Sequence, residues 1–229
     1  MIVILLAALG GYMLYRPRFA GDDVATDASP RKRLEPYFRK AGVAYPPRQI
    51  AFLIFKDERR VTLWAKSGDD WRFVRHYEIQ AASGHAGPKL REGDKQVPEG
   101  VYRIEHLNPN SAYHLSMKVS YPNAFDRRMA HRDRRTKLGG DIFIHGKAVS
   151  IGCVAVGDRA IEELFALVKE TGVSKVKVII APNDFRAGRP ILHRDVPPWT
   201  SELYRDIANA LSEFPLRKEG MPNARVAFR

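Results

Sequence analysis

The residues with the clearest chemical potential lie between Asp141 and Ala155, where the chain reads DIFIHGKAVSIGCVA. Cys153 is the only cysteine among the 229 residues, and His145 precedes it in the same segment. A thiol becomes a nucleophile when a nearby base takes its proton and the surroundings favour the thiolate. Gly152 lets the backbone approach a bound carbonyl closely, so the amides of Gly152 and Cys153 can face a developing oxyanion. The segment therefore predicts a thiol acyl-transfer site.

An inert role for both residues is the competing interpretation. A lone cysteine is more often a small buried hydrophobe than a nucleophile. A lone histidine is likewise more often a hydrogen-bonded core or surface residue. The pairing of His145 with Cys153 across a Ser-x-Gly-Cys turn that begins at Ser150 favours the catalytic interpretation.

Short strands and a few helices are expected to position this segment. Apolar runs and period-two alternation predict strands over residues 50–55, 61–65, 71–80, 101–107, 113–120, 142–144 and 176–181. The strand over 142–144 would carry His145 at its C-terminal end. Helices are predicted over residues 33–41, with Pro36 in the first turn, and over 199–214. Another helix should begin at Asp158 as its cap and stop at Gly172.

Four regions follow from the composition along the chain. Residues 2–15 form an uncharged, largely apolar run, which suits a signal peptide and is short of the roughly 20 residues of a membrane-spanning helix. We expect residues 1–19 to be a signal peptide or membrane anchor and residues 20–47 to be a linker and short helix. Residues 48–184 would form the catalytic domain, and residues 185–229 a C-terminal helix and basic tail packed on it. A buried N-terminal strand or helix is the alternative for the apolar run.

The chain is strongly basic, with 38 Lys and Arg against 26 Asp and Glu and a formal net charge of +12. Such a balance favours polyanionic partners. The basic stretch at residues 127–137 is either a solvated face or a surface that attracts anionic envelope components. It lacks interleaved aromatic residues, so no nucleic-acid partner is expected. The sequence has no His-Glu-x-x-His, no paired Cys and no nucleotide-binding fingerprint, so neither a metal nor a cofactor is expected.

Several multi-residue blocks, in order, carry a family resemblance. The His-Gly pair at residues 145–146 and the Ser-Ile-Gly-Cys turn at 150–153 are preceded by three such blocks. These are residues 83–102 (SGHAGPKLREGDKQVPEGVY), 107–111 (LNPNS) and 121–126 (YPNAFD). From about Leu34 to the C-terminus the chain resembles the L,D-transpeptidase catalytic domain of the YkuD type. Within that family it is similar to the murein L,D-transpeptidase branch with a Ser-Ile-Gly-Cys signature.

The resemblance implies a mainly β, sandwich-like L,D-transpeptidase domain with flanking α-helices. It implies that Cys153 attacks a carbonyl in the stem peptides of peptidoglycan and forms a thioester, while His145 acts as general base and then general acid. The backbone carbonyl of Gly146 would orient the imidazole, and the amide of Gly152 would donate to the oxyanion. Substrate binding is expected from Ser150 and from three residues of the 121–126 block, namely Tyr121, Asn123 and Asp126.

Two departures from the family pattern keep alternatives open. Ile151 stands where many relatives have a second His, and Ala155 stands where they have an Arg that follows the Cys. The first hypothesis is L,D-transpeptidation, either between stems or to a protein. The second is hydrolysis through the same thioester, which would release a wall-linked lipoprotein or peptide. The third is a non-catalytic, basic wall-binding protein. All three imply a periplasmic or otherwise extracytoplasmic protein, anchored or secreted.

Overall fold

The apolar and alternating runs of the sequence form a curled sheet, which the computed structural model describes within residues 28–216. Its nine strands are β1 (Ile50–Phe55), β2 (Arg60–Ser67), β3 (Asp70–Glu78), β4 (Ala81–Ala82), β5 (Gly100–Ser111), β6 (His114–Val119), β7 (Phe143–His145), β8 (Val154–Ala155) and β9 (Val176–Ala181). The helices are α1 (Pro30–Ala41), α2 (Ala124–Arg132), α3 (Asp158–Thr171) and α4 (Thr200–Leu211), with a short 3-10 helix, η1 (Val173–Lys175). The prediction of a mainly β fold with flanking helices is confirmed.

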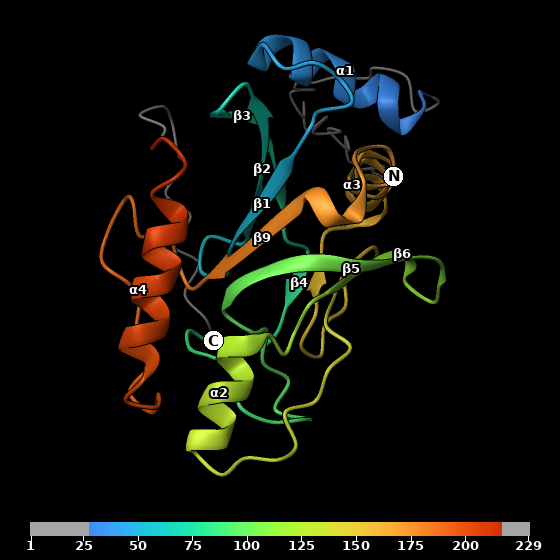
Figure 1. The fold of residues 1–229 in the computed structure, drawn as a ribbon. Helices are drawn as coiled ribbons and strands as arrows, with labels where there is room; N and C mark the ends of the chain where they lie inside the picture. The colour runs from blue at the N-terminus through green and yellow to red at the C-terminus, as the bar shows by residue number, and fades with distance from the viewer. Residues whose placement is uncertain (1–27, 217–229) are drawn as a thin grey trace, which may run out of the picture.

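The sheet follows the order β3-β2-β1-β9-β5-β6-β7-β8-β4. β1 pairs with β9 in parallel, and β7 pairs with β8 in parallel, whereas the other neighbours are antiparallel. In Figure 1 the long β5–β6 hairpin crosses the molecule from side to side, and α1 and α3 lie above it, whereas α2 lies below it. The predicted strands are all present, with ends shifted by a few residues. One shift matters for the site, because His145 lies inside β7 rather than after it.

Two apolar cores lie on the two faces of the sheet, and β1 contributes to both. Phe52 and Ile54 belong to the core that α1 and α3 cover, whereas Leu53 and Phe55 belong to the core that α4 and α2 cover. Successive side chains of a strand point to opposite faces, so an unbroken apolar run is what a doubly covered strand requires. Burying each such side chain stabilises the fold by roughly 1.5–3 kcal/mol.

The start of α1 differs from the prediction. Ser29 caps the helix by accepting from the backbone N–H of Lys32, and Pro30 occupies the first helical position. The helix therefore begins before Arg33, and Pro36 lies inside it rather than in its first turn. A Pro at the first position has no N–H to leave unpaired and a backbone already suited to the helix, which explains the earlier start.

The predicted capping role of Asp158 is wrong. The cap residue of α3 is Gly157, at a positive φ of 81°, and it makes no side-chain capping bond. Asp158 is the first helical residue, and its carboxylate accepts from the backbone N–H of Lys147 at 2.7 Å instead. The carboxylate thus ties the start of α3 to the loop that follows β7. Gly172 does end the helix, as predicted.

A buried charge cluster fixes α1 to α3 and to β3. Arg33 of α1 donates to Glu162 and Glu163 of α3, at 2.8 and 2.9 Å. The Glu163 carboxylate also accepts from Arg75 at 2.8 Å and from the Tyr77 hydroxyl at 3.0 Å. A buried carboxylate is tolerated when several donors surround it. This cluster therefore fixes the position of α1 on α3 and β3.

The expectations for the two chain ends fall largely outside the described residues. The signal or anchor assigned to residues 1–19 and most of the basic tail lie there. Within residues 28–216, none of the helices has the length and apolar character needed to cross a membrane. α4 packs on the sheet through Leu203, Ile207 and Leu211.

Candidate active site

The parallel pairing of β7 and β8 places Cys153, the predicted nucleophile, next to the strand pair that holds His145, the predicted base. Ile144 lies opposite Val154, and His145 lies opposite Ala155. Cys153 directly precedes Val154, so its place in the register is beside Phe143, one pleat away from His145. Paired positions of neighbouring strands project to the same face, and residues two apart in a strand share a face. Continued one residue before β8, this register would set Cys153 on the same face as His145.

The His145 ring is held in one tautomer. Its Nδ1 lies 2.6 Å from the carbonyl oxygen of Gly146, and since a carbonyl only accepts, Nδ1 carries the proton. Nε2 then has the free lone pair. The ring is buried and lies against the Tyr113 ring, with centroids 4.7 Å apart. Burial lowers the pKa of His145, and the Gly146 carbonyl partly opposes this shift. The resting base is therefore a neutral imidazole at neutral pH.

Glycine is required at position 146 because the backbone is crowded there. A Cβ on Gly146 would lie 2.6 Å from Oδ1 of Asp158 and 2.7 Å from the carbonyl oxygen of Tyr113. Real Cβ atoms do not approach other atoms so closely, so any larger residue must displace the loop. The carbonyl that orients His145 is in this way fixed between the start of α3 and the β5–β6 turn.

Cys153 is half-buried, and its thiol donates to the carbonyl oxygen of Asp141 at 3.7 Å. Burial raises the pKa of this thiol. The backbone at Phe143 and the positive charge of Lys89 lower the thiol pKa in part, while the Asp141 carboxylate raises it further. At neutral pH the Cys153 thiol is accordingly protonated and the His145 imidazole is neutral. Such a pair needs a proton transfer before or during attack.

Hydroxyl groups stabilise the turn that presents Cys153. Ser150 Oγ donates to the Cys153 carbonyl at 2.7 Å and accepts from the Gly152 N–H at 3.3 Å. Ser83 Oγ lies 3.2 Å from Ser150 Oγ and donates to the Lys95 carbonyl at 2.7 Å. Gly152 has φ 124°, which side chains rarely allow. The Gly152 N–H thus already donates to Ser150 Oγ through a long bond. It could donate to an oxyanion only after that bond breaks.

The other residues expected to bind substrate have partners within the protein. Asn123 and Asp126 form a capping box at the start of α2, with reciprocal bonds of 2.9 Å. Asn123 also donates to the Val101 carbonyl, and the Tyr121 hydroxyl donates to the Leu138 carbonyl. Tyr121 and Asp126 are buried. Their contact with substrate, like that of Ser150, stays a prediction.

The two positions that depart from the family pattern have opposite surroundings. The Ile151 side chain is 74% exposed, and Val149 in the same loop is 54% exposed, so apolar surface flanks the thiol. Ala155 is fully buried and pairs with Ala81 of β4.

Sequence reasoning missed four residues that surround Cys153 and His145. They are Ser83, Lys89, Tyr113 and Asp141. Ser83 and Lys89 belong to the 83–102 block, whose match to the family was a usable signal. Tyr113 contacts His145 through its ring, and Asp141 contacts Cys153 through its backbone carbonyl. Neither contact could be predicted from a residue pattern.

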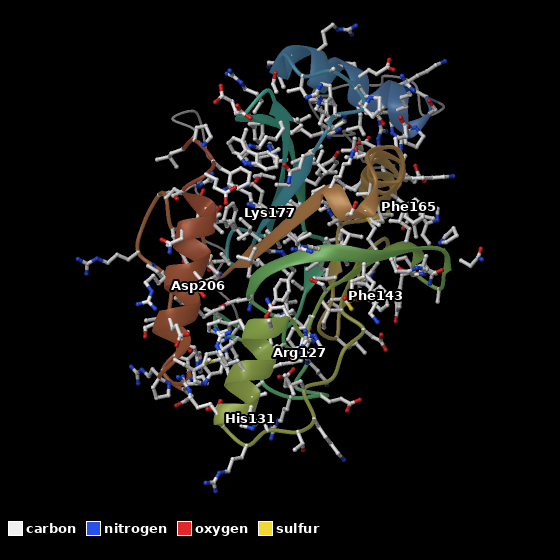
Figure 2. The ribbon with its side chains drawn as sticks, in the orientation of Figure 1. Arg127, His131, Phe143, Phe165, Lys177 and Asp206 are labelled. Atoms are coloured by element: carbon white, nitrogen blue, oxygen red, sulfur yellow. The ribbon has the colours of Figure 1, made fainter. Side chains whose placement is uncertain are left out.

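The basic stretch at residues 127–137 forms an exposed face. Arg127 and His131 project from α2 (Figure 2). Arg128 and Arg132 lie 3.6 and 3.8 Å from the Glu202 carboxylate of α4.

Phe143 at the start of β7, labelled in the same figure, pairs with Lys118 of β6, which places the site beside the β5–β6 hairpin. Within residues 28–216 no group of three or more His, Cys, Asp or Glu side chains is arranged to hold a metal ion.

The comparisons with known proteins agree with this geometry. The L,D-transpeptidase catalytic domain, YkuD, matches residues 49–180, which is more than half of the chain. The chain therefore belongs to the YkuD family of L,D-transpeptidase catalytic domains. It is 37% identical over 134 residues to "Putative L,D-transpeptidase YafK" of Escherichia coli (strain K12), a match that covers 56% of this chain and 52% of the relative. The chain thus spans about half the length of the curated relatives it matches.

A solved structure supports the fold. The helical cell shape determining protein Pgp2 from Campylobacter jejuni matches with a TM-score of 0.50 and 24% sequence identity. The match covers 59% of this chain and 48% of that chain. At this level of identity the likeness concerns the fold alone.

Proposed function

We propose that the protein is a cysteine-dependent murein L,D-transpeptidase that acts on peptidoglycan stem peptides through a thioester on Cys153. The main support is the 2.6 Å bond from His145 Nδ1 to the Gly146 carbonyl. This bond leaves Nε2 unprotonated, and Cys153 directly precedes the strand that pairs with β7. A base with a free lone pair beside a lone half-buried thiol is the arrangement that acyl transfer requires.

The reaction would run in two halves. Nε2 of His145 takes the thiol proton as Sγ attacks the carbonyl carbon of a stem-peptide bond. The oxyanion of the tetrahedral intermediate is stabilised by the amides of Cys153 and Gly152, the latter after it leaves Ser150. The carbon–nitrogen bond then breaks, and His145 returns the proton to the leaving amine. In the second half an acceptor amine attacks the thioester, His145 takes the amine proton, and the released thiolate recovers it.

Hydrolysis through the same thioester is the second candidate. Its support is the buried Ala155, which offers no cation to hold a substrate carboxylate, together with the 74% exposure of Ile151 beside the thiol. Water that reaches the thioester would replace the amine and release a free carboxylate. The substrate would then be a wall-linked lipoprotein or peptide. A purely non-catalytic wall-binding role has less support, since it leaves the His145–Cys153 geometry without a purpose.

The location follows from the substrate. Members of the family act on the cell wall, so we propose an extracytoplasmic, periplasmic enzyme whose export is directed by residues 1–19. The exposed basic face at residues 127–137 would favour anionic envelope components. A fusion of residues 1–30 to a reporter that is active only after export tests this proposal.

The decisive experiment incubates the purified protein with defined muropeptides and identifies the products by mass spectrometry. Transpeptidation gives dimers joined by a new peptide bond, whereas hydrolysis gives shortened stems. Cys153→Ser should keep the fold and lose nearly all of either product, since a hydroxyl is far less ionised than a thiol at neutral pH. Wild-type turnover in a well-folded Cys153→Ser protein would overturn the proposal.

A carbapenem offers a second test of the same site. The drug mimics the acyl donor and should add one drug mass to wild-type protein, but none to Cys153→Ser, in intact-mass analysis. Labelling by a small thiol reagent without a drug adduct would show that the donor pocket differs from the one proposed.

A further inference from the structure

Ser83 lies beside the turn at residues 150–153, although 67 residues separate it from Ser150 in the sequence. Ala82, the last residue of β4, pairs with Val154, the first residue of β8. The two strands are antiparallel, so Ser83 leaves the strand pair at the end where Cys153 enters it. The Ser83 hydroxyl oxygen contacts the turn directly, at 3.2 Å from Ser150 Oγ.

The backbone around Ser83 is held by the buried side chain of Gln96. Gln96 Nε2 donates to the carbonyls of His85 and Gly87, each at 2.6 Å, and Gln96 Oε1 accepts from the His85 N–H at 2.9 Å. The Val97 N–H donates to the Ser83 carbonyl at 3.4 Å. Because these bonds hold the backbone, the Ser83 hydroxyl can change its acceptor by rotating its proton about the Cβ–Oγ bond alone.

The hydroxyls of Ser83 and Ser150 make more contacts than their protons can serve at once. Each hydroxyl carries one proton, and a carbonyl only accepts. Ser83 Oγ donates to the Lys95 carbonyl at 2.7 Å, and Ser150 Oγ donates to the Cys153 carbonyl at 2.7 Å. With both protons placed in this way, none lies between the two hydroxyl oxygens, and Ser150 Oγ accepts from the Gly152 N–H at 3.3 Å. The 3.2 Å contact becomes a hydrogen bond when Ser83 rotates its proton from Lys95 to Ser150.

This second arrangement is the one that acyl transfer needs. The Gly152 N–H must leave Ser150 Oγ before it can donate to an oxyanion. A half-buried hydroxyl oxygen that loses its donor raises the free energy of that step. The Ser83 proton can replace the lost donor without movement of the backbone. The Lys95 carbonyl belongs to an exposed residue and can accept from water in exchange.

We propose that Ser83 is a positioning residue of the oxyanion site: its hydroxyl proton turns from the Lys95 carbonyl to Ser150 Oγ as the Gly152 N–H moves to the oxyanion. The inference rests on the proposed function in taking the Gly152 amide as an oxyanion donor. Protons are conserved in the exchange, because each hydroxyl keeps its own and one O–H···O bond replaces one N–H···O bond at Ser150. Ser83 thus acts through Ser150 rather than on the substrate.

The test compares two reagents that differ in whether an oxyanion forms on the purified full chain. Iodoacetamide alkylates the thiolate at a saturated carbon, so no oxyanion develops there. p-Nitrophenyl acetate acylates the thiolate through a tetrahedral oxyanion and releases p-nitrophenolate, which is followed by absorbance. Cys153 is the only cysteine of the chain, and Cys153→Ser gives the background rate for both reagents. The ratio of the two rates therefore reports on oxyanion stabilisation separately from thiol reactivity.

The variants at position 83 test the hydroxyl. Ser83→Ala should lower the acylation rate by roughly three- to tenfold, the scale of one neutral hydrogen bond, and leave the alkylation rate unchanged. Ser83→Thr keeps the hydroxyl and should restore acylation. Ser83→Thr and Ser83→Val have the same shape and differ in that hydroxyl, so they make the same comparison if Ser83→Ala does not fold.

Two further variants test the path through Ser150 and the specificity of the effect. If Ser83 acts through Ser150, Ser83→Ala should have no further effect on acylation in a Ser150→Ala protein. Ser212, which follows α4, also donates to a backbone carbonyl at 2.7 Å, that of Asn209. Ser212→Ala is therefore the matched control, and it should change neither rate.

The outcomes are distinct. Wild-type acylation in a folded Ser83→Ala protein overturns the inference. A parallel loss of acylation and alkylation also overturns it, since that pattern indicates a structural role, and so does a wild type that is alkylated but not acylated. No peptidoglycan enters the assay, so a wild type that is acylated without turning over muropeptides would remove the proposed function and leave this measurement valid.

Discussion

Replacing Asp126 by Asn should stabilise the protein at neutral pH. Asp126 is 8% exposed at the start of α2, and burial raises its pKa from 3.8 to about 6. One oxygen accepts from the Asn123 N–H at 2.9 Å. The other faces the Tyr102 hydroxyl at 3.5 Å, but the single hydroxyl proton has a shorter bond, 2.9 Å, to the Glu99 carbonyl. An amide at position 126 keeps the first bond and can donate to the Tyr102 oxygen.

The magnitude follows from the pKa shift and its sign. Between about pH 4 and 6 the folded state keeps a proton on Asp126 that the unfolded state has lost, so the free energy of unfolding falls as pH rises. A difference of about two pKa units corresponds to about 3 kcal/mol. Above pH 6 the wild type bears the whole penalty of a buried charge, whereas Asp126→Asn bears none.

Urea unfolding at a series of pH values from 3.5 to 8 provides the assay. The wild type should lose stability relative to Asp126→Asn as pH rises, with the difference complete above pH 6. Asp70→Asn removes a carboxylate whose side chain is 73% exposed and serves as the matched control, with no such divergence expected. Parallel curves for wild type and Asp126→Asn would refute the reasoning. Loss of muropeptide turnover in a stabilised Asp126→Asn protein would instead support the predicted contact with substrate.

Three further changes have definite expected results. Gly146→Ala should destabilise the protein by roughly 1–3 kcal/mol in urea unfolding and lower turnover at least tenfold, because its Cβ displaces the carbonyl that holds His145; wild-type turnover would contradict the account of the base. Glu163→Gln should cost roughly 3–5 kcal/mol in the same assay, since it removes the buried carboxylate charge between Arg33 and Arg75 and leaves Arg33 only its more exposed partner Glu162, whereas Glu35→Gln on the exposed surface of α1 should cost less than about 1 kcal/mol. Turnover should persist below pH 6.5, the ordinary histidine value, because the lowered pKa of His145 keeps its base form available; a pH–rate profile that already falls above 6.5 would contradict this.

The strands and the long helices could be predicted from the sequence because burial imposes their period. The apolar run at residues 50–55 required a strand covered on both faces, and the stripe at Ile161, Leu164 and Val168 required a helix. α2 was missed, although Asn123 and Asp126 have the spacing of a capping box. Its four basic residues before Asp133 suggested a charged surface segment and hid the apolar contacts of Phe125 and Met129 with α4.

Cys153 and His145 could be proposed as site residues from residue type and spacing, and their catalytic roles stay predictions, but much of their surroundings could not be predicted. The tautomer of His145 depends on a carbonyl, and the thiol's acceptor is the backbone of Asp141. Backbone groups carry no residue-specific signal. The wrong prediction of Asp158 as a helix cap has a similar cause. Its type and position favoured a helix cap, and the close approach of Lys147 gave its carboxylate a different partner.

His145 and Cys153 lie at the two ends of one short connection between parallel strands. Residues 146–153 join β7 to β8, so the chain leaves the sheet after His145 and re-enters it after Cys153. A single covalent loop and one strand pairing therefore link the two residues, and the start of α3 holds the same loop through the bond from the Lys147 N–H to Asp158. Weakening a core contact of α4 should therefore reduce the fraction of molecules that are folded while each folded molecule keeps its reactivity, whereas loosening the start of α3 should also change the reactivity.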